Sequence, residues 1–300
     1  MPDSRPPRII DYEGSTYRTD FWEGRGRDYE DRAERIALRR LLPPQGGRRL
    51  LEIGAGFGRI TNEYEAYQQV VLLDYSFSQL QYAREHFGDS GRYVYVAADA
   101  YRLPFRPGTF DGATMVRVIH HMADVPAMLE QVRRCLVTGG LFILEHANKR
   151  NLKAMLRYAL GRQAWSPYNQ EPVEFVELNF DFHPQYIADR LTDAGFAISQ
   201  RIPVSFFRLG MLKRAMPPTT LAALDGLLQS TGLLYAPSVF AGCNAVGASE
   251  DNLALDGEAL FACPETGGPL TRDGDTLVST QTGARYAIRD GIYDFKAPLD

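Results

Sequence analysis

The sequence predicts an α/β protein, and two observations carry this prediction. Between residues 50 and 145, apolar strand-like runs alternate with segments whose apolar residues recur at helical spacing. That alternation is typical of a mainly parallel sheet with helices on both faces. The chain also has 300 residues, of which 45% are hydrophobic, so it can build a substantial core and has room for two domains.

Each element is predicted from its periodicity and its end signals. The first helix covers residues 29–42, because its apolar pattern stops at Pro43 and Pro44. Ser76 with Gln79 forms a capping box at the start of a helix that Gly88 ends. The predicted strands are residues 50–53, 70–74, 93–97, 111–118, 141–145, 196–204 and 238–246. The other predicted helices are residues 59–67, 76–87, 125–136 and 184–195, with a mixed helical region over 207–228.

Changes in composition divide the chain into two parts. Residues 1–249 are predicted to form the main domain, with an N-terminal arm and an insertion at 148–182 of the kind that forms lids. Residues 250–300 contain short strands and turns that are too few to bury much surface alone. We therefore expect a small β module that docks on the main domain.

Charge and cysteine content exclude several classes of protein. The chain has 33 basic and 37 acidic residues, and a net charge of −4 argues against nonspecific nucleic-acid binding. Three cysteines indicate no disulfide scaffold. The N-terminus has no signal-peptide pattern, and Pro237, Ser238 and Asn244 break the apolar stretch 231–248, so we expect a cytoplasmic protein without a membrane span.

The strongest motif is a glycine loop between a strand and a helical segment. Gly54, Gly56 and Gly58 follow the apolar run that ends at Ile53. Glycine at such a turn allows a positive φ and lets a ligand approach the backbone. A nicotinamide or flavin motif would need its third glycine where this chain has Arg59, so the loop disfavours an oxidoreductase.

Polar residues follow the next two predicted strands. Asp74 ends the second strand, twenty residues after Gly54, where a carboxylate can accept both hydroxyls of a nucleoside ribose. Tyr75 beside it offers a flat face for adenine. Asp99 and Ala100 follow the third strand. All of these residues fall at the carboxyl ends of strands, where open α/β sheets bind ligands.

Taken together, these residues resemble a class I S-adenosylmethionine-dependent methyltransferase of the type 11 domain, over roughly residues 30–200. The resemblance lies in Glu52-x-Gly54-x-Gly56-x-Gly58, Asp74, Asp99-Ala100, Leu103-Pro104-Phe105, Phe110-Asp111 and Arg117-Val118-Ile119-His120-His121. It implies a Rossmann-like sheet of seven strands, one of them antiparallel, and S-adenosylmethionine as the cofactor. It places Glu52 at the methionine part, Asp74 at the ribose, and Asp99 at the adenine. The implied cofactor-binding residues are Glu52, Gly54, Ala55, Gly56, Gly58, Asp74, Tyr75, Asp99, Ala100 and Arg117.

Two side chains are the candidate catalytic residues. Positioning supplies most of the acceleration in methyl transfer, but an acceptor that must lose a proton needs a base. His120 follows the fourth strand beside the methyl-group position that the resemblance implies, and Glu145 ends the fifth strand. The resemblance implies that His121 is a structural residue. For His146 and His183, a structural role is the alternative to a catalytic one. No metal site is predicted.

The acceptor is predicted to be a small molecule that is methylated at oxygen or nitrogen. Residues 117–120 lack the Asn/Asp-Pro-Pro-aromatic motif of amino methyltransferases that act on bases, and Cys135 lies on a helix whose pattern predicts burial. One alternative is an RNA or protein acceptor, which salt-sensitive RNA binding would favour. The other is a nonenzymatic partner that binds the cofactor and stabilises another protein. Oligomeric state is open.

Two further segments are candidates for contact with the acceptor. The N-terminal arm gathers aromatic and basic residues that either grip an anionic or aromatic acceptor or pack on the sheet: Tyr17, Phe21, Trp22, Arg25, Arg27 and Tyr29. The insertion contains a basic amphipathic helix. We expect its apolar face, including Leu152 and Leu156, to pack as a lid, with Lys153 and Arg157 in solvent. An anionic acceptor or peripheral contact with a membrane is the alternative.

The last fifty residues resemble the small zinc-ribbon-like activator subunit of tRNA, rRNA and release-factor methyltransferases. The four positions of its metal ligands hold Cys263, Thr266, Ser279 and Thr282, which cannot make a structural zinc site. The module is therefore expected to fold without metal. The resemblance implies that it supports the main domain, and substrate contact is the rival role.

Overall fold

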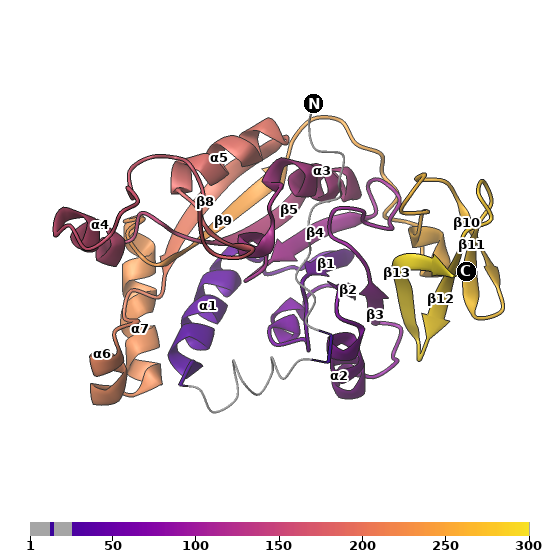
Figure 1. Cartoon of the computed structure of the whole chain (residues 1–300). Helices are drawn as coiled ribbons and strands as arrows, with labels where there is room; N and C mark the ends of the chain where they lie inside the picture. Colours follow the sequence, from indigo (N-terminus) through magenta and orange to yellow (C-terminus); the bar gives the residue numbers. More distant parts are fainter. Residues whose placement is uncertain (1–12, 15–25, 300) are drawn as a thin grey trace.

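A computed structural model describes residues 13–14 and 26–299, which form an eleven-stranded sheet flanked by helices (Figure 1). The strand order is β10-β11-β12-β13-β3-β2-β1-β4-β5-β9-β8. The sheet strands of the main domain are β1 (Arg49–Ile53), β2 (Gln69–Asp74), β3 (Tyr93–Ala97), β4 (Phe110–Met115), β5 (Leu136–Ala147), β8 (Phe196–Val204) and β9 (Ser238–Ala245). The C-terminal strands are β10 (Leu270–Asp273), β11 (Thr276–Ser279), β12 (Arg285–Arg289) and β13 (Ile292–Leu299). A separate hairpin pairs β6 (Val173–Val176) with β7 (Asn179–Asp181).

The predicted α/β class is confirmed, but the predicted count of seven strands is wrong. Strands β3, β2, β1, β4 and β5 are parallel, and β9 runs antiparallel to both β5 and β8. These seven strands are continued by four strands from the C-terminal residues. β13 pairs in parallel with β3, with Ile292 opposite Tyr95 and Asp294 opposite Ala97. The count differs because the edge strand β3 pairs with β13 and leaves no open edge there.

The helices match most of the predicted ranges. They are α1 (Asp28–Leu41), α2 (Phe77–Phe87), α3 (Val125–Cys135), α4 (Leu152–Ala159), α5 (Pro184–Asp193), α6 (Gly210–Ala215) and α7 (Pro218–Leu228). The predicted ends of α2 are confirmed in part, because Ser76 Oγ accepts a hydrogen bond from Gln79 N at 3.4 Å and Gly88 follows the helix with φ 72°. The return bond of a capping box is not formed, since Ser76 N donates to Asp74 Oδ1 instead of the Gln79 side chain. The helix predicted over residues 59–67 is mostly turns, with a 3₁₀ helix, η2, at Thr61–Tyr64.

Helices cover both faces of the sheet. Leu38 of α1, Leu80 of α2 and Leu221 of α7 are buried in the core on one face. Leu129 of α3 and Leu191 of α5 are buried in the core on the other face. Among the described residues, no helix is long and apolar enough to cross a membrane.

Residues 250–299, here called the tail, belong to the second of these cores. Phe261 is 1% exposed, and its ring centroid lies 5.8 Å from that of Phe105 in the main domain. The rings of Tyr293 and Phe295 lie 4.5 and 5.1 Å from Phe261. Cys263 Sγ lies 3.6 Å from the hydroxyl oxygen of Tyr286. The tail is thus joined to the main domain by strand pairing and by aromatic packing.

Residues 148–182, here called the insertion, differ from what their pattern predicts. The pattern predicts that the apolar face of α4 packs, but Leu152, Leu156 and Leu160 are exposed. Lys149, which precedes α4, is buried, and its Nζ donates to Asn169 Oδ1 and Glu171 O, both at 2.6 Å. The expectation of a packed apolar face is therefore wrong, since the sequence pattern does not specify which face meets the protein.

Candidate functional site

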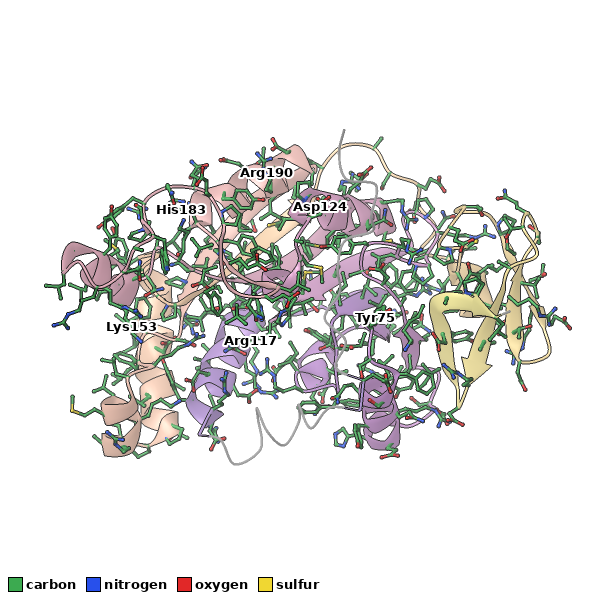
Figure 2. All side chains as sticks on the ribbon, viewed as in Figure 1. Tyr75, Arg117, Asp124, Lys153, His183 and Arg190 are labelled. Atoms are coloured by element: carbon green, nitrogen blue, oxygen red, sulfur yellow. The ribbon has the colours of Figure 1, made fainter. Side chains whose placement is uncertain are left out.

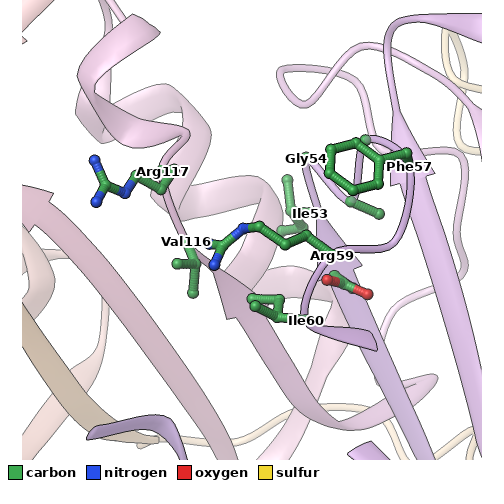
Figure 3. Close-up of a pocket in the computed structure, with 10 residues that line it drawn as sticks. Ile53, Gly54, Phe57, Arg59, Ile60, Val116 and Arg117 are labelled. Carbon is green, nitrogen blue, oxygen red and sulfur yellow. The ribbon is translucent and has the colours of Figure 1, made fainter. Parts of the chain in front are cut away.

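A pocket lies at the carboxyl ends of β1 and β4 and encloses about 440 Å³, its open mouth included. In Figure 3, Gly54 and Phe57 of the glycine loop lie on one side, Val116 and Arg117 on the other, and Arg59 between them. The lining residues are Glu52, Ile53, Gly54, Ala55, Gly56, Phe57, Arg59, Ile60, Val116 and Arg117.

The glycine loop is held by the backbone of β2. Gly54 N and Ala55 N donate to Leu73 O at 2.7 and 3.0 Å. Gly54 has φ 71°, and a Cβ there would lie 2.1 Å from the Val118 side chain. Gly56 has φ 54°, but a Cβ there would meet no atom within 4 Å. Gly54 is therefore required by close packing, whereas Gly56 borders open space in which a ligand fits against the backbone.

Asp74 connects the glycine loop to the start of α2. Its Oδ2 accepts from Gly56 N and its Oδ1 accepts from Ser76 N, both at 2.8 Å. Asp74 thus fixes the backbone on both sides of the turn that follows β2. The ammonium of Lys296, from the tail, lies 5.4 Å from the ring centroid of the neighbouring Tyr75. The tail thus reaches the edge of the predicted cofactor site.

Five of the predicted cofactor residues lie outside the pocket lining, and one of them is Asp74. Gly58 faces Phe87, whose Cε2 would lie 2.4 Å from an added Cβ. Asp99 is buried and accepts from Tyr101 N at 2.8 Å, as a turn residue does. Ala100 packs against the core, and Tyr75 borders the tail. The structure brings together Glu52, Gly54, Ala55, Gly56 and Arg117 in the pocket, with Asp74 directly behind Gly56.

Glu52 is a buried acid in the pocket wall. Thr61 Oγ1 donates to its Oε2 at 2.6 Å. Burial raises the pKa of Glu52 to about 8, and the hydrogen bond from Thr61 only partly offsets this. Glu52 is therefore mainly protonated at neutral pH, and a cation bound beside it would favour the carboxylate.

Glu34 of α1 joins the two guanidinium groups of the pocket. Its Oε2 accepts from Arg59 Nη2 at 2.9 Å, and its Oε1 accepts from Arg117 Nε at 2.8 Å. Burial alone would raise the pKa of Glu34, but the charges of Arg117 and Arg59 lower it to about 2. Sequence analysis missed Glu34 and gave Arg59 no role in the site. The available signal was an acid at position 34 beside the apolar Ala33 and Ala37.

Arg117 belongs to the opposite wall, and Glu145 lies behind its backbone. Arg117 has φ 64°, an uncommon value for a residue with a side chain, and such strain is found at functional sites. Its backbone N donates to Glu145 Oε2 at 2.9 Å. The other oxygen of the buried Glu145 accepts from Ser238 Oγ. Glu145, predicted as catalytic, thus positions the strained backbone of Arg117.

His120 lies in a 3₁₀ turn, η3 (Ile119–His121), directly after Arg117. Burial, together with the positive charges of His121 and Arg117, lowers the pKa of His120 well below its usual range. Its imidazole is therefore neutral and able to accept a proton. His121 Nδ1 donates to Leu178 O of the insertion at 3.0 Å, which fits a structural role.

The other histidines have local structural roles. His146 is buried, and burial lowers its pKa to about 4. His183 Nδ1 accepts from Gln185 N at 3.1 Å and caps α5. As predicted, Cys135 is buried, and burial raises the pKa of its thiol to about 11, so it is a poor nucleophile.

Arg208, which follows β8, carries hydrogen-bond donors without partners. Its Nε and Nη2 are shielded from solvent and have no hydrogen-bond acceptor among the described residues. Burial lowers the pKa of Arg208, and the charges that act on it most include those of Arg117, Glu34 and Glu145. Burial also raises the pKa of Asp181, in the insertion, to about 6, and Arg208 counteracts that rise. Sequence analysis gave no signal for Arg208.

Only part of the predicted N-terminal cluster can be placed. Tyr17, Phe21, Trp22 and Arg25 lie outside the described residues. Tyr29 is buried in α1, where its hydroxyl donates to Asp225 Oδ2 at 2.5 Å and accepts from Phe207 N at 2.9 Å. Of the two interpretations given for this cluster, contact with an acceptor and packing on the main domain, Tyr29 fits packing.

Sequence comparison identifies one segment of the chain. Residues 51–144 match the family described as a methyltransferase domain. The O-methyltransferase cnsE of Penicillium expansum is 29% identical over 154 residues, which are 47% of this chain and 55% of that protein. The ubiquinone/menaquinone biosynthesis C-methyltransferase UbiE of Saccharophagus degradans is 34% identical over 115 residues, 36% of this chain and 46% of that protein. The chain thus spans about half the length of the curated relatives it matches.

Two solved structures resemble about three quarters of this chain in fold. An S-adenosylmethionine-dependent methyltransferase from Listeria monocytogenes has a TM-score of 0.52 and 15% identity, covering 73% of this chain and 99% of that chain. A chain of the complex between the Haloferax volcanii Trm112 methyltransferase activator and a methyltransferase has a TM-score of 0.52 and 18% identity, covering 76% of this chain and 97% of that chain. The protein therefore has the fold of S-adenosylmethionine-dependent methyltransferases, and its residues 51–144 match the methyltransferase domain.

Proposed function

We propose that this protein is an S-adenosylmethionine-dependent methyltransferase that acts on an oxygen or nitrogen nucleophile of a small molecule. The observation that carries the proposal is the pocket at the ends of β1 and β4. Its glycine loop leaves open space at Gly56 and is fixed from behind by Asp74. This loop lies within the segment that matches the methyltransferase domain.

The residues of the pocket fit the chemical groups of this cofactor. Glu52 lines the pocket as an acid that an ammonium group would ionise, and Arg59 and Arg117 line it as partners for a carboxylate. The carboxylate of Asp74 is an acceptor of the kind that ribose hydroxyls need. We assign Tyr75, Asp99 and Ala100 to the adenine end. When bound, the cofactor supplies a methyl group on a positively charged sulfur, and the chain's task is to hold the acceptor in line with it.

On the acceptor side, His120 and Arg208 carry the proposed roles. We assign His120 to the acceptor nucleophile; its imidazole is neutral at neutral pH, and its lowered pKa makes it a weak proton acceptor. The two partnerless donors of Arg208 suit an anionic group, because a buried guanidinium without an acceptor is costly. Glu145 acts through the backbone of Arg117 and is a positioning residue.

Calorimetric titration tests the cofactor assignment. The purified chain is titrated with S-adenosylmethionine and S-adenosylhomocysteine, with NADH as the control. Binding of the two adenosyl ligands alone supports the proposal, and transfer of radiolabelled methyl to pooled small acceptors then tests the reaction. Binding without turnover on any acceptor pool would favour a nonenzymatic partner protein instead. Salt-sensitive RNA binding would favour an RNA acceptor.

The anionic class of acceptor is tested at Arg208. Activity is measured on acceptors that carry a carboxylate and on matched neutral acceptors with the same nucleophile. Arg208→Gln is expected to raise KM for the carboxylate acceptors by about ten- to hundredfold while leaving the neutral ones unchanged. Arg162→Gln removes an exposed guanidinium and is the matched control. An equal effect of Arg208→Gln on both acceptor sets would contradict the assignment.

For the tail, we propose that it supports the main domain. It pairs along β3, covers Phe105 with Phe261, and brings Lys296 to Tyr75. Deleting residues 252–300 is expected to lower the melting temperature or the solubility. A truncated chain that is equally soluble and equally stable would disprove the supporting role.

A further inference from the structure

Helix α4 presents its apolar side to solvent. Leu152, Leu156 and Leu160 are 58%, 55% and 65% exposed. Successive helical residues are rotated by about 100°, so these three leucines form one stripe. Ala154 is 5% exposed and lies about 160° around the helix from Leu152 and from Leu156. The helix therefore rests on the protein through a small alanine and turns its leucine stripe outward.

The apolar surface continues onto the loop before β9. Leu233 and Tyr235 are exposed there. The loop is fixed to the start of α4, because Tyr235 O accepts from Leu152 N at 2.9 Å. Asn148 Nδ2 also donates to Leu234 O and Ala236 O, at 3.1 and 2.8 Å. The helix and the loop thus form one fixed surface at the end of the molecule opposite the C-terminal strands (Figure 1).

Cationic side chains border the leucine stripe. Lys153 and Arg157 each follow a leucine of the stripe by one residue, which places them about 100° further around the helix. Both are exposed, and neither forms an ion pair in the part of the chain that the structure describes. Figure 2 shows Lys153 on α4, at the outer end of the molecule. Arg150 lies with its guanidinium carbon 5.7 Å from the ring centroid of Tyr235.

We propose that this α4 surface, made of Leu152, Leu156, Leu160, Leu233 and Tyr235 with the cations Lys153 and Arg157, docks on an anionic lipid membrane. A soluble chain rarely leaves such a stripe uncovered without an interaction partner. Leucines bordered by lysine and arginine are typical of helices that lie in a membrane interface. The chain carries a net charge of −4, so the local cations are what an anionic bilayer would attract.

The neighbouring hairpin sets the limit of the proposed surface. Phe175 and Val176 of β6 are also exposed. They are flanked by the exposed acids Glu174 and Glu177, which an anionic bilayer would repel. The proposed membrane contact therefore lies on α4 and on the loop before β9, on the side of the sheet that contains β5. Docking through this surface needs no cofactor or acceptor and is independent of the proposed reaction.

Vesicle flotation of the full chain tests the docking surface. Vesicles of phosphatidylcholine alone are compared with vesicles that also contain phosphatidylglycerol, at low and high salt. Binding is expected only to the anionic vesicles and is expected to fall with salt. Replacing Lys153 and Arg157 by Gln should weaken it about thirtyfold. Replacing Leu152, Leu156 and Leu160 by Gln should weaken it about a hundredfold.

Matched controls distinguish lipid docking from misfolding and from self-association. Leu299→Gln changes an exposed leucine on β13, at the other end of the molecule, and should leave vesicle binding unchanged. Since the three leucines of α4 are exposed, their replacement should also leave the melting temperature unchanged. Equal binding to neutral vesicles, or none to anionic ones, would overturn the proposal. A dimer in analytical ultracentrifugation that the leucine replacements dissociate would overturn it in favour of a second copy.

Discussion

The tail and the insertion are both additions to the same α/β core, yet they treat their apolar residues in opposite ways. The tail buries Phe261 and Phe295 and pairs its last strand with β3. The insertion leaves Leu152, Leu156 and Leu160 of α4 in solvent. The apolar residues of the tail thus complete the core, whereas the leucines of the insertion form part of the surface.

The same contrast divides the two walls of the pocket. On the β1–β2 side, Asp74 uses both oxygens to fix the glycine loop, and Glu34 satisfies two guanidiniums. Toward β8 and the insertion, Arg208 has buried donors without partners among the described residues. The side proposed for the cofactor is therefore already organised, whereas the side proposed for the acceptor has polar groups that a ligand would satisfy.

The largest expected effect on stability comes from a substitution in the tail. Phe261→Ala should lower the free energy of unfolding by about 3 to 5 kcal/mol, because the ring is buried against Phe105, Tyr293 and Phe295. Leu156→Ala in the insertion is the matched change and should alter stability by about 0.5 kcal/mol or less. Urea denaturation measures both. Equal losses would show that the two additions do not differ as described.

Removal of Glu34 is expected to have the next largest effect. Glu34→Ala removes the carboxylate that Arg59 and Arg117 share, although Arg59 keeps its ion pair with Asp31, and should cost about 3 kcal/mol of stability. The pKa of Glu34 is about 2, below its ordinary 4.5, so its contribution is present above pH 4.5 and is lost as pH falls toward 2. The variant should therefore lose stability less steeply than the parent over that interval. Denaturation at a series of pH values checks this, and parallel curves would contradict it.

Asp74 tests whether the organised side binds the cofactor. Asp74→Ala should weaken S-adenosylmethionine binding by about 1.5 to 3 kcal/mol, since hydrogen bonds to a charged group are lost. Gly56 N and Ser76 N also lose their acceptor in this variant. Asp74→Asn keeps one carbonyl oxygen and serves as the control for loop structure. Calorimetry measures the affinities, and an unchanged value for Asp74→Ala would refute the assignment.

The smallest expected effect is a pH dependence at Glu52. The free acid has a pKa of about 8, and a bound ammonium would favour its ionised form, so binding releases a proton below that pH. Affinity for S-adenosylmethionine should therefore rise with pH, by about tenfold per unit at most, and level off near pH 8. Glu52→Gln should bind with no such slope. A slope that survives in Glu52→Gln would assign the titration to another group.

The sequence by itself determined the elements and the glycine loop. The strand predicted over residues 196–204 is observed as β8 with the same bounds, and Ser76 and Gly88 end α2 as predicted. Gly54, Gly56 and Asp74 come together at the ends of β1 and β2. Such features depend on periodicity, caps and turns, which are local properties of neighbouring residues, and so the sequence contains them directly.

Only the tertiary structure decided which distant groups meet. The bridge from Glu34 to Arg59 and Arg117 joins three separate elements. β13, the fourth strand of the tail, enlarges the sheet because it pairs with β3. The leucines of α4 face solvent. A helical sequence pattern defines an apolar side of the helix, but it does not determine whether another part of the chain covers that side. Two guanidinium nitrogens of Arg208 are shielded from solvent without an acceptor among the described residues for the same reason, since burial depends on what the rest of the chain places around a group.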